Sequence, residues 1–208
     1  MSRITTLEEL RALYREPSAV VQSKVRPTLD ATSIAFIERC PFVLLGTVGG
    51  DGRVDVSPRG GPPGFIRVHN NTVALPDLNG NNLIDTLRAV VETGRVAMLF
   101  VMPGRDETLR VNGDAHVSVD EELLGGFTSD LRLPKCAIVM EPSEVFIHCA
   151  KAFRRGHVWQ PATWPSFNDA PDAVDILRCQ LDIPGDGTQL RDSLERTYTA
   201  DLLADLAE

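Results

Sequence analysis

The chain has 208 residues, of which 43% are apolar and 24% charged, and its formal net charge is −8 at pH 7. This size and composition are ordinary for one globular domain, or one domain with an appended tail. An acidic chain without a basic run is a poor candidate for binding duplex nucleic acid or an anionic membrane, and no apolar run approaches the ~18 residues of a membrane span.

Two helices are expected before the first strand. Residues 5–16 combine a threonine cap, glutamates in the first turn and leucines at helical spacing. Residues 17–28 contain two prolines and predict an irregular or weakly helical connection, and Asp30 then starts a second helix that ends before Pro41. We expect both helices to pack on the core.

Short connections then predict an antiparallel meander of strands rather than β-α-β units. One helix is inserted after the fourth strand, and the series favours a small antiparallel barrel, a mainly β protein with flanking helices (α+β). The expected strands are residues 42–48, 53–57, 65–68, 72–75, 95–102, 108–119, 137–142 and 143–149.

The stretch from Asp51 to Val68 departs from a regular strand at its centre. Residues 57–64 contain three prolines and three glycines, which are expected to break the ladder after a strand that ends at Ser57. Bare backbone N–H groups together with Ser57 and Arg59 on a rigid corner can hold an anionic group. A long hairpin loop without a ligand explains the same residues.

The helix inserted after the fourth strand offers a second possible anion site. Apolar residues between 83 and 91 are expected to share one face of this helix, and Gly94 ends it. Asn79, Asn81 and Asn82 precede the helix, at positions where N-cap residues are expected. They either cap the helix, or leave its free N–H groups and its dipole to bind an anion.

Basic residues later in the chain allow two interpretations. Arg110 stands in a strand whose neighbours look half-buried, so it either meets an anionic partner or lies on a solvated face. Lys151, Arg154 and Arg155 fall within one helical turn and next to aromatic residues. They form either a solvated charged face or an anion-binding lobe.

The remaining expectations concern organisation and compartment. Residues 1–165 are assigned to the barrel domain, and residues 166–208 to a helical tail that packs on the same or a partner subunit. The N-terminus lacks a basic-then-apolar signal, which predicts a cytoplasmic protein. Four cysteines without a Cys-x-x-Cys pair predict reduced thiols and no metal site, with Cys40 and Cys149 packed in the core.

Four phrases, in order along the chain, carry a resemblance to a known family. They resemble the pyridoxamine 5′-phosphate oxidase-related flavoproteins, and more narrowly a branch of uncharacterised FMN-binding members, over about Ile4 to Trp164. Four ordered phrases are far more specific than a lone glycine motif. The phrases are VDVSPRGGPPGFIRV, ALPDLNGNNLIDTLR, MLFVMPGRDETLRVNG and EVFIHCAKAFRRGHVW.

The resemblance implies a split β-barrel that forms a homodimer, with two FMN sites at the subunit interface. It implies that Ser57, Arg59 and Gly60 line the flavin, and that Asn81 and Asn82 correspond to positions that help hold the FMN phosphate. Many relatives place Arg or Lys at the last two positions. The neutral asparagines therefore shift this work to Arg59 or to the helix dipole.

The resemblance also brings residues from later in the chain to the cofactor. Thr108 and Arg110 would approach the flavin from the other subunit. Lys151, Arg154 and Arg155 fall where the oxidase has its C-terminal substrate and cofactor contacts.

The mechanism implied is that of a flavoenzyme, in which the isoalloxazine ring performs the hydride or electron chemistry and the protein orients it. We expect no catalytic acid or base, and we expect Arg110 and Ser57 to donate hydrogen bonds that stabilise the reduced ring. The expected function is FMN-dependent oxidoreduction of an unknown small molecule. The alternatives are a flavin-binding module or redox sensor without turnover, and a relative that uses a deazaflavin or haem.

Overall fold

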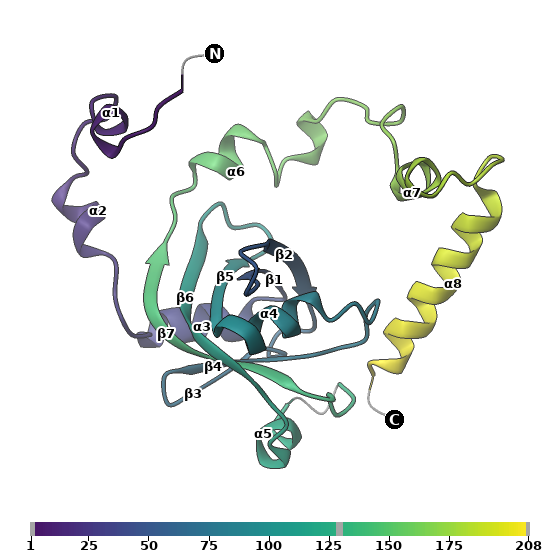
Figure 1. The fold of residues 1–208 in the computed structure, drawn as a ribbon, viewed down its shortest axis with the longest axis horizontal. Coiled ribbons are helices and arrows are strands. Elements are labelled where there is room, and N and C mark those ends of the chain that lie inside the picture. The colour runs from purple at the N-terminus through teal and green to yellow at the C-terminus, as the bar shows by residue number, and fades with distance from the viewer. Residues whose placement is uncertain (1–2, 128–130, 207–208) are drawn as a thin grey trace.

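The structure is a computed structural model that describes residues 3–127 and 131–206. One antiparallel sheet of seven strands curls into an open barrel with helices around it, which confirms the expected α+β split barrel (Figure 1). The strand order is β2-β1-β5-β6-β7-β4-β3, so β2 and β3 are the two edges. The strands are β1 (Phe42–Val48), β2 (Val54–Gly60), β3 (Arg67–His69), β4 (Thr72–Pro76), β5 (Arg95–Val101), β6 (Thr108–Ser118) and β7 (Ala137–Ile147).

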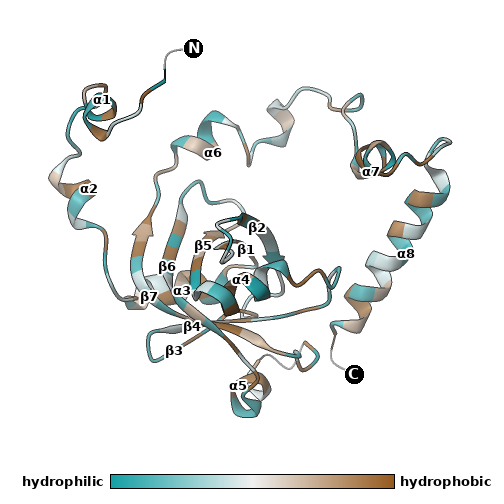
Figure 2. Cartoon of the chain, viewed as in Figure 1, coloured by the Kyte–Doolittle hydropathy of each residue, from teal (hydrophilic) through white to brown (hydrophobic). Residues whose placement is uncertain are grey.

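The core lies inside the barrel and follows from the alternation of side chains along the strands. In β1, Val43 and Leu45 are fully buried, while the residues between and beyond them are less so. Met98 and Phe100 of β5 and Val111 of β6 belong to the same fully buried cluster. Figure 2 shows apolar residues along these strands and also, away from the barrel, on the C-terminal helices.

Strand β2 is longer than the sequence predicts. It stays paired with β1 as far as Gly60, which lies opposite Phe42, while Pro58 lies opposite Leu44. The expected break at Ser57 is therefore wrong, and the irregular segment begins at Gly61. An edge strand tolerates a proline because one side of its backbone has no ladder to complete.

The two strands expected at 137–142 and 143–149 form one strand, β7. A bulge in β7 itself leaves Ser143 without a partner in β6, because Asn112 lies opposite Glu144 and the next residue, Gly113, lies opposite Pro142. A bulge leaves a backbone position unpaired, so Pro142 can lie inside the strand without ending it.

Two helices pack on the barrel near the functional region. Helix α3 (Ala31–Arg39) starts at Asp30, whose Oδ1 accepts hydrogen bonds from the N–H groups of Thr32 (2.8 Å) and Ser33 (2.9 Å), as predicted. Helix α4 (Asp85–Thr93) ends at Gly94, whose φ of 65° is left-handed.

The buried face of α4 differs from the predicted one. Its buried residues are Thr86, Ala89 and Val90, whereas Leu83 and Ile84 lie before the helix and are exposed. The helix begins two residues later than the apolar pattern indicates, so Leu83 and Ile84 are not part of it, and Val91, which was also expected on the buried face, is exposed.

The other helices lie outside the barrel. The N-terminal helix α1 has no buried residue, so the expectation that it packs on the core is wrong. The C-terminal part of the chain runs as an arc beside the barrel, and α8 returns to it only near its end (Figure 1). These elements are α1 (Leu7–Arg11), α2 (Ala19–Ser23), α5 (Glu121–Gly125), α6 (Lys151–Arg155), the 3₁₀ turn η1 (Pro161–Thr163), α7 (Ala173–Leu181) and α8 (Thr188–Ala204).

The four cysteines differ in burial. All four thiols are free, as predicted, and Cys40 and Cys136 are buried. Cys149 is exposed, contrary to prediction, because it follows the end of β7 and no longer alternates into the core.

Across residues 3–127 and 131–206, no helix has the length and apolar character needed to cross a bilayer.

Candidate functional site

A cavity of about 700 Å³ lies where five segments of the chain meet. Its walls come from β2, the loop after β4, the start of α4, the segment before β7 and the end of α8. The cavity brings together two stretches that the sequence singled out separately, Ser57 with Arg59 and Asn79 with Asn81 and Asn82.

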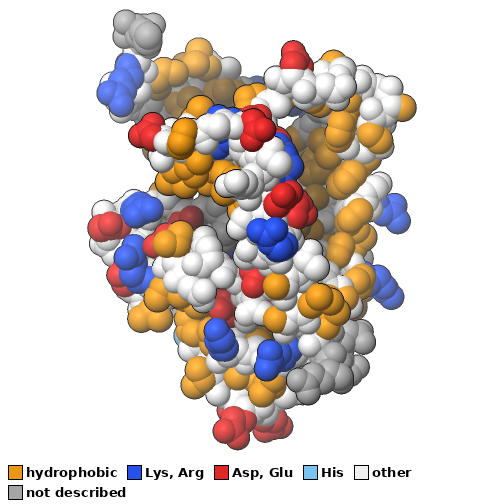
Figure 3. All heavy atoms as spheres, turned by 90° about the vertical axis from the view of Figure 1, so that its right-hand side faces the viewer, with side chains coloured by type: hydrophobic (Ala, Val, Ile, Leu, Met, Phe, Trp, Pro, Cys, Tyr) orange, Lys and Arg blue, Asp and Glu red, His pale blue; other side chains and the backbone are white. Residues whose placement is uncertain are grey.

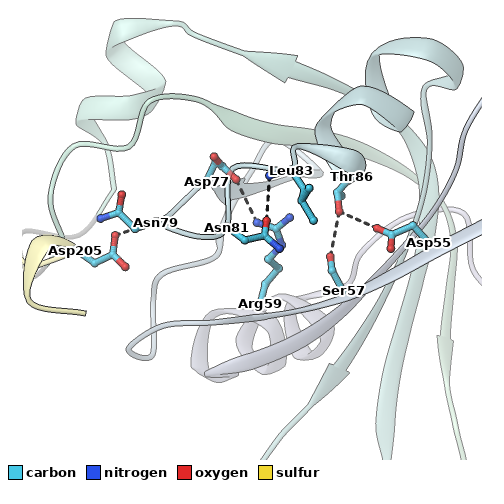
Figure 4. A network of polar contacts seen from close by, with 9 residues as sticks. All are labelled: Asp55, Ser57, Arg59, Asp77, Asn79, Asn81, Leu83, Thr86 and Asp205. Carbon is cyan, nitrogen blue, oxygen red and sulfur yellow. Dashed lines mark hydrogen bonds and ion pairs between the residues drawn. The ribbon is translucent and has the colours of Figure 1, made fainter. Parts of the chain in front are cut away.

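The wall formed by β2 follows from strand alternation. Asp55, Ser57 and Arg59 line the cavity, while Val54 and Val56 point the other way and are 73% and 63% exposed. Because a strand repeats every two residues, the polar set of β2 faces one space and the apolar set faces outward (Figure 4).

Ser57, Thr86 and Asp55 form a hydrogen-bonded chain at this wall (Figure 4). The Thr86 hydroxyl, which is buried, donates to Oδ2 of Asp55 at 3.0 Å, and its oxygen lies 3.1 Å from Oγ of Ser57. A hydroxyl has one proton, and the Thr86 proton is used on Asp55. Ser57 therefore donates to Thr86 and has only its lone pairs left for a ligand.

Arg59 is tied to the neighbouring wall by an ion pair. Its Nη1 lies 3.1 Å from Oδ1 of Asp77, and the two side chains are 25% and 22% exposed. The Nε of Arg59 is buried and has no hydrogen-bond partner among the described residues. Beside the pair, burial and then the charge of Asp77 raise the pKa of the Cys136 thiol, which keeps the thiol protonated at neutral pH.

The asparagine-rich loop does not cap the helix, which was one of the two alternatives that the sequence left open. Helix α4 starts at Asp85 without a side-chain cap, and Oδ1 of Asn81 instead accepts from the N–H of Leu83 at 3.1 Å. Asn82 and Ile84 both have left-handed backbones, with φ of 59° and 52°. The loop therefore turns before the helix begins, which puts the asparagines on the cavity rim instead of at the helix cap.

The end of the C-terminal helix closes one side of the cavity. Oδ1 of Asp205 accepts from the N–H of Asn79 at 3.0 Å (Figure 4). The carbonyl of Asp205 accepts from the N–H of Arg132 at 2.8 Å. Asp201 also lines the cavity, one helical turn earlier. The tail is thus part of the site wall, and residues 207 and 208 of the predicted tail lie outside the described residues.

The charge of the lining is more acidic than the sequence suggested. It contains five carboxylates and three cations, a formal difference of −2. Of these groups, the sequence singled out only Arg59. Asp55, Asp77 and Asp85 lie within the phrases that carry the family resemblance but were given no role, and the other four lie outside those phrases. The carboxylates are Asp55, Asp77, Asp85, Asp201 and Asp205, and the cations are Arg59, Arg132 and Lys135.

The other predicted site residues are not part of this cavity. Gly60 is the last residue of β2 and does not line the cavity. The side chain of Thr108 is buried within the single chain. Arg110 forms an ion pair with Glu144 and lies over the ring of Phe146, 5.0 Å from its centroid. Arg110 alternates with Leu109 and Val111, whose side chains are in the core, so it lies on the other face of β6, where Glu144 is its anionic partner.

The basic cluster lies on α6, as its spacing predicted, and away from the cavity. Lys151, Arg154 and Arg155 are all exposed. Nε of Arg154 lies 2.9 Å from Oδ2 of Asp106, which raises the pKa of Arg154. In the described parts of the chain, no three His, Cys, Asp or Glu side chains form a group able to hold a metal ion.

Comparison with family models gives one match. Residues 29–149 match the model described as pyridoxamine 5′-phosphate oxidase, which covers the barrel from the start of α3 to the end of β7. The matched segment contains four of the five walls of the cavity, and the end of α8 lies outside it.

Solved structures share part of the architecture. A conserved hypothetical protein from Mycobacterium tuberculosis is 12% identical, with a TM-score of 0.46 over 73% of this chain and 96% of that one. HupZ from Group A Streptococcus is 15% identical, with a TM-score of 0.44 over 57% and 93%. A pyridoxamine 5′-phosphate oxidase-related, FMN-binding protein from Nostoc punctiforme is 13% identical, with a TM-score of 0.38 over 51% and 73%.

These identities and scores are too low to support an inference about ligands or activity. A comparison with curated proteins gives no match.

Proposed function

The chain belongs to the pyridoxamine 5′-phosphate oxidase family, and we propose that it binds flavin mononucleotide in this cavity and acts as an oxidoreductase on a small molecule. The observation that carries the proposal is the convergence of Ser57, Arg59, Asn81 and Asn82 on one cavity, although they come from two separate stretches of the sequence. These are four of the residues that the family resemblance assigns to the flavin.

The cavity suits a ligand of this kind. Its volume of about 700 Å³ falls within the range of roughly 300–1,000 Å³ that is usual for small-molecule and cofactor sites. The buried Nε of Arg59, which has no partner among the described residues, is a donor that a ligand oxygen or nitrogen can satisfy.

When bound, the flavin supplies the hydride or electron chemistry. The residues of this chain bind and orient it. Ser57 presents a hydrogen-bond acceptor, because its proton is used on Thr86, so its expected role as a donor to the reduced ring does not agree with the structure. Arg59 presents the donor Nε. Asn81 and Asn82 place neutral amides on the rim.

We further propose that the protein is a homodimer in which Arg110 of the partner subunit completes the site. The expected role of Thr108 does not agree with the structure, because its side chain is buried within the single chain. Two features support an interface on the outer surface of the barrel. Val54 and Val56 are exposed side by side on the edge strand β2. A shallow groove across β1, β5 and β6 contains Asn112, whose buried side-chain oxygen has no described partner.

The cofactor is tested on the purified protein. A yellow protein that releases FMN, or that takes up added FMN near one per chain, is expected. Protein that is colourless and takes up no FMN would contradict the proposal. Mass spectrometry of the released cofactor separates FMN from a deazaflavin or haem. Stopped-flow reduction across electron donors then separates an oxidoreductase from a flavin-binding module or redox sensor without turnover.

The place of the flavin is tested by Arg59→Ala. Because this change removes a charged hydrogen-bond donor from the cavity wall and leaves Asp77 unpaired, we expect FMN binding to weaken by about 1–3 kcal/mol. Riboflavin binding should weaken similarly, since the Nε of Arg59 needs no phosphate as its partner. A flavin titration followed by fluorescence measures both, and unchanged affinities would remove Arg59 from the site.

A further inference from the structure

Arg132 and Lys135 stand out among the charged residues of the cavity. Of the three cations in the lining, Arg59 is paired with Asp77. Among the described residues, Arg132 and Lys135 form no ion pair, and both side chains are exposed. They are therefore the two cations of the lining whose charge a ligand can use without first breaking a contact seen here.

The backbone holds the segment that carries both residues against the cavity. At its start, the N–H of Arg132 donates to the carbonyl of Asp205 at 2.8 Å, next to a bridge between Leu131 and Leu206. At its end, the carbonyl of Cys136 accepts from the N–H of Asp77 at 2.9 Å. Both ends of the segment are thus fixed to other walls of the same cavity.

The balance of charge decides which end of the cavity suits an anion. A group near Arg59 would meet one cation together with the carboxylates of Asp55 and Asp77. The asparagines of the opposite loop carry no charge to offset them. A group at the segment of Arg132 and Lys135 would meet two cations together with the carboxylates of the two residues that hold this segment, Asp77 and Asp205. A phosphate monoester carries about −1.5 to −2 charges at neutral pH, so it needs more than one cation. Arg132 and Lys135 lie three residues apart on one segment and provide two.

We propose that Arg132 and Lys135 bind the phosphate of the cofactor, with the flavin ring directed toward Ser57 and Arg59. This inference rests on the proposed function and extends it, because it assigns the anionic end of the ligand to a segment that carries no recognisable motif. An arginine contributes paired donors for phosphate oxygens, and a lysine adds a point charge.

The experiment compares FMN with riboflavin, which lacks the phosphate, in fluorescence titrations of the cofactor-free protein. We expect the unchanged protein to prefer FMN. Arg132→Gln and Lys135→Gln should each raise the FMN dissociation constant by about tenfold, the effect of losing roughly one charged hydrogen bond, and the double variant by more. Riboflavin binding should stay the same in all three variants. In these three variants, the salt dependence of FMN binding should be weaker than in the unchanged protein.

Two control variants separate local contacts from general charge. Arg39→Gln with Arg53→Gln removes two exposed cations that do not line the cavity, and the preference for FMN should remain. Arg59→Gln with Asp77→Asn removes the ion pair without changing net charge. This pair of changes should weaken FMN and riboflavin alike and leave their ratio unchanged.

The possible results of these titrations distinguish the proposed function from the assignment of the phosphate site. Unchanged protein that binds neither flavin contradicts the proposed function itself. Protein that binds both flavins equally, or a double variant that keeps the preference for FMN, overturns the assignment of Arg132 and Lys135 while leaving flavin binding intact. Loss of the preference in the Arg59–Asp77 variant instead would move the phosphate to Arg59. Thermal unfolding of each single variant, expected to be unchanged because the side chains are exposed, confirms that the comparison is made on folded protein.

Discussion

At the scale of single residues, Thr86 is the side chain on which the polar wall depends. It is buried, and its hydroxyl connects Asp55 with Ser57. Thr86→Val keeps the shape but leaves both partners without this contact, so we expect the free energy of unfolding to fall by about 1–3 kcal/mol. Urea denaturation measures the change.

The matched control for this prediction is Thr86→Ser, which keeps the hydroxyl and removes only a methyl group. It should retain more of the stability than Thr86→Val. If both variants lose the same amount, the methyl packing of Thr86 matters and the hydrogen-bonded chain does not.

At the scale of elements, the bulge at Ser143 is what lets β7 run as one strand past Pro142. A Cβ atom on Gly113 would collide with the carbonyl of Glu141 in the facing strand. Since backbone cannot move aside cheaply, Gly113→Ala should destabilise the protein by about 2–4 kcal/mol. Thermal or urea unfolding tests this, with Gly125→Ala, where a Cβ would meet nothing within 4 Å, as the control.

The end of α8 is the second element with a testable role, because it places a carboxylate against the loop after β4. Asp205→Asn can still accept the hydrogen bond from Asn79 but no longer carries the charge. If the ligand is anionic, FMN should bind about two- to fivefold more tightly at low salt, and the gain should shrink as salt screens it. Riboflavin should show no gain, and weaker FMN binding would contradict the charge argument.

At the scale of the whole molecule, apolar side chains remain uncovered in the single chain. Figure 3 shows such side chains exposed on the face that carries the C-terminal helices. Three large side chains of α8, Tyr198, Leu202 and Leu203, are at least half exposed. Val54 and Val56 form another exposed pair on the edge strand β2. Uncovered apolar surface of this extent is typical of a chain that associates.

We therefore expect the protein to be a dimer in light scattering, and the double variant Val54→Lys, Val56→Lys to be monomeric. Both side chains point away from the core, so the fold should persist, which circular dichroism checks. The variant should bind FMN more weakly if the partner completes the site. A monomeric unchanged protein that still binds FMN would contradict an interfacial site.

The sequence by itself determined the parts of the fold that depend on neighbouring residues. Alternating apolar residues specified the strands, Asp30 specified the start of α3, and Gly94 specified the end of α4 through its left-handed backbone. It also singled out Ser57 and Arg59, because a polar pair within a proline- and glycine-rich stretch is a local pattern. Such features need no knowledge of distant contacts.

Only the tertiary structure decided where charges meet. Arg110 finds Glu144 on the next strand, and Arg59 finds Asp77, because strand pairing and loop packing bring together residues with no fixed spacing. The same holds for Arg132 and Asp205, which share a cavity although the chain between them forms all of β7 and the helices from α6 to α8. An ion pair or a cavity depends on distances in space, and a local pattern carries no information about them.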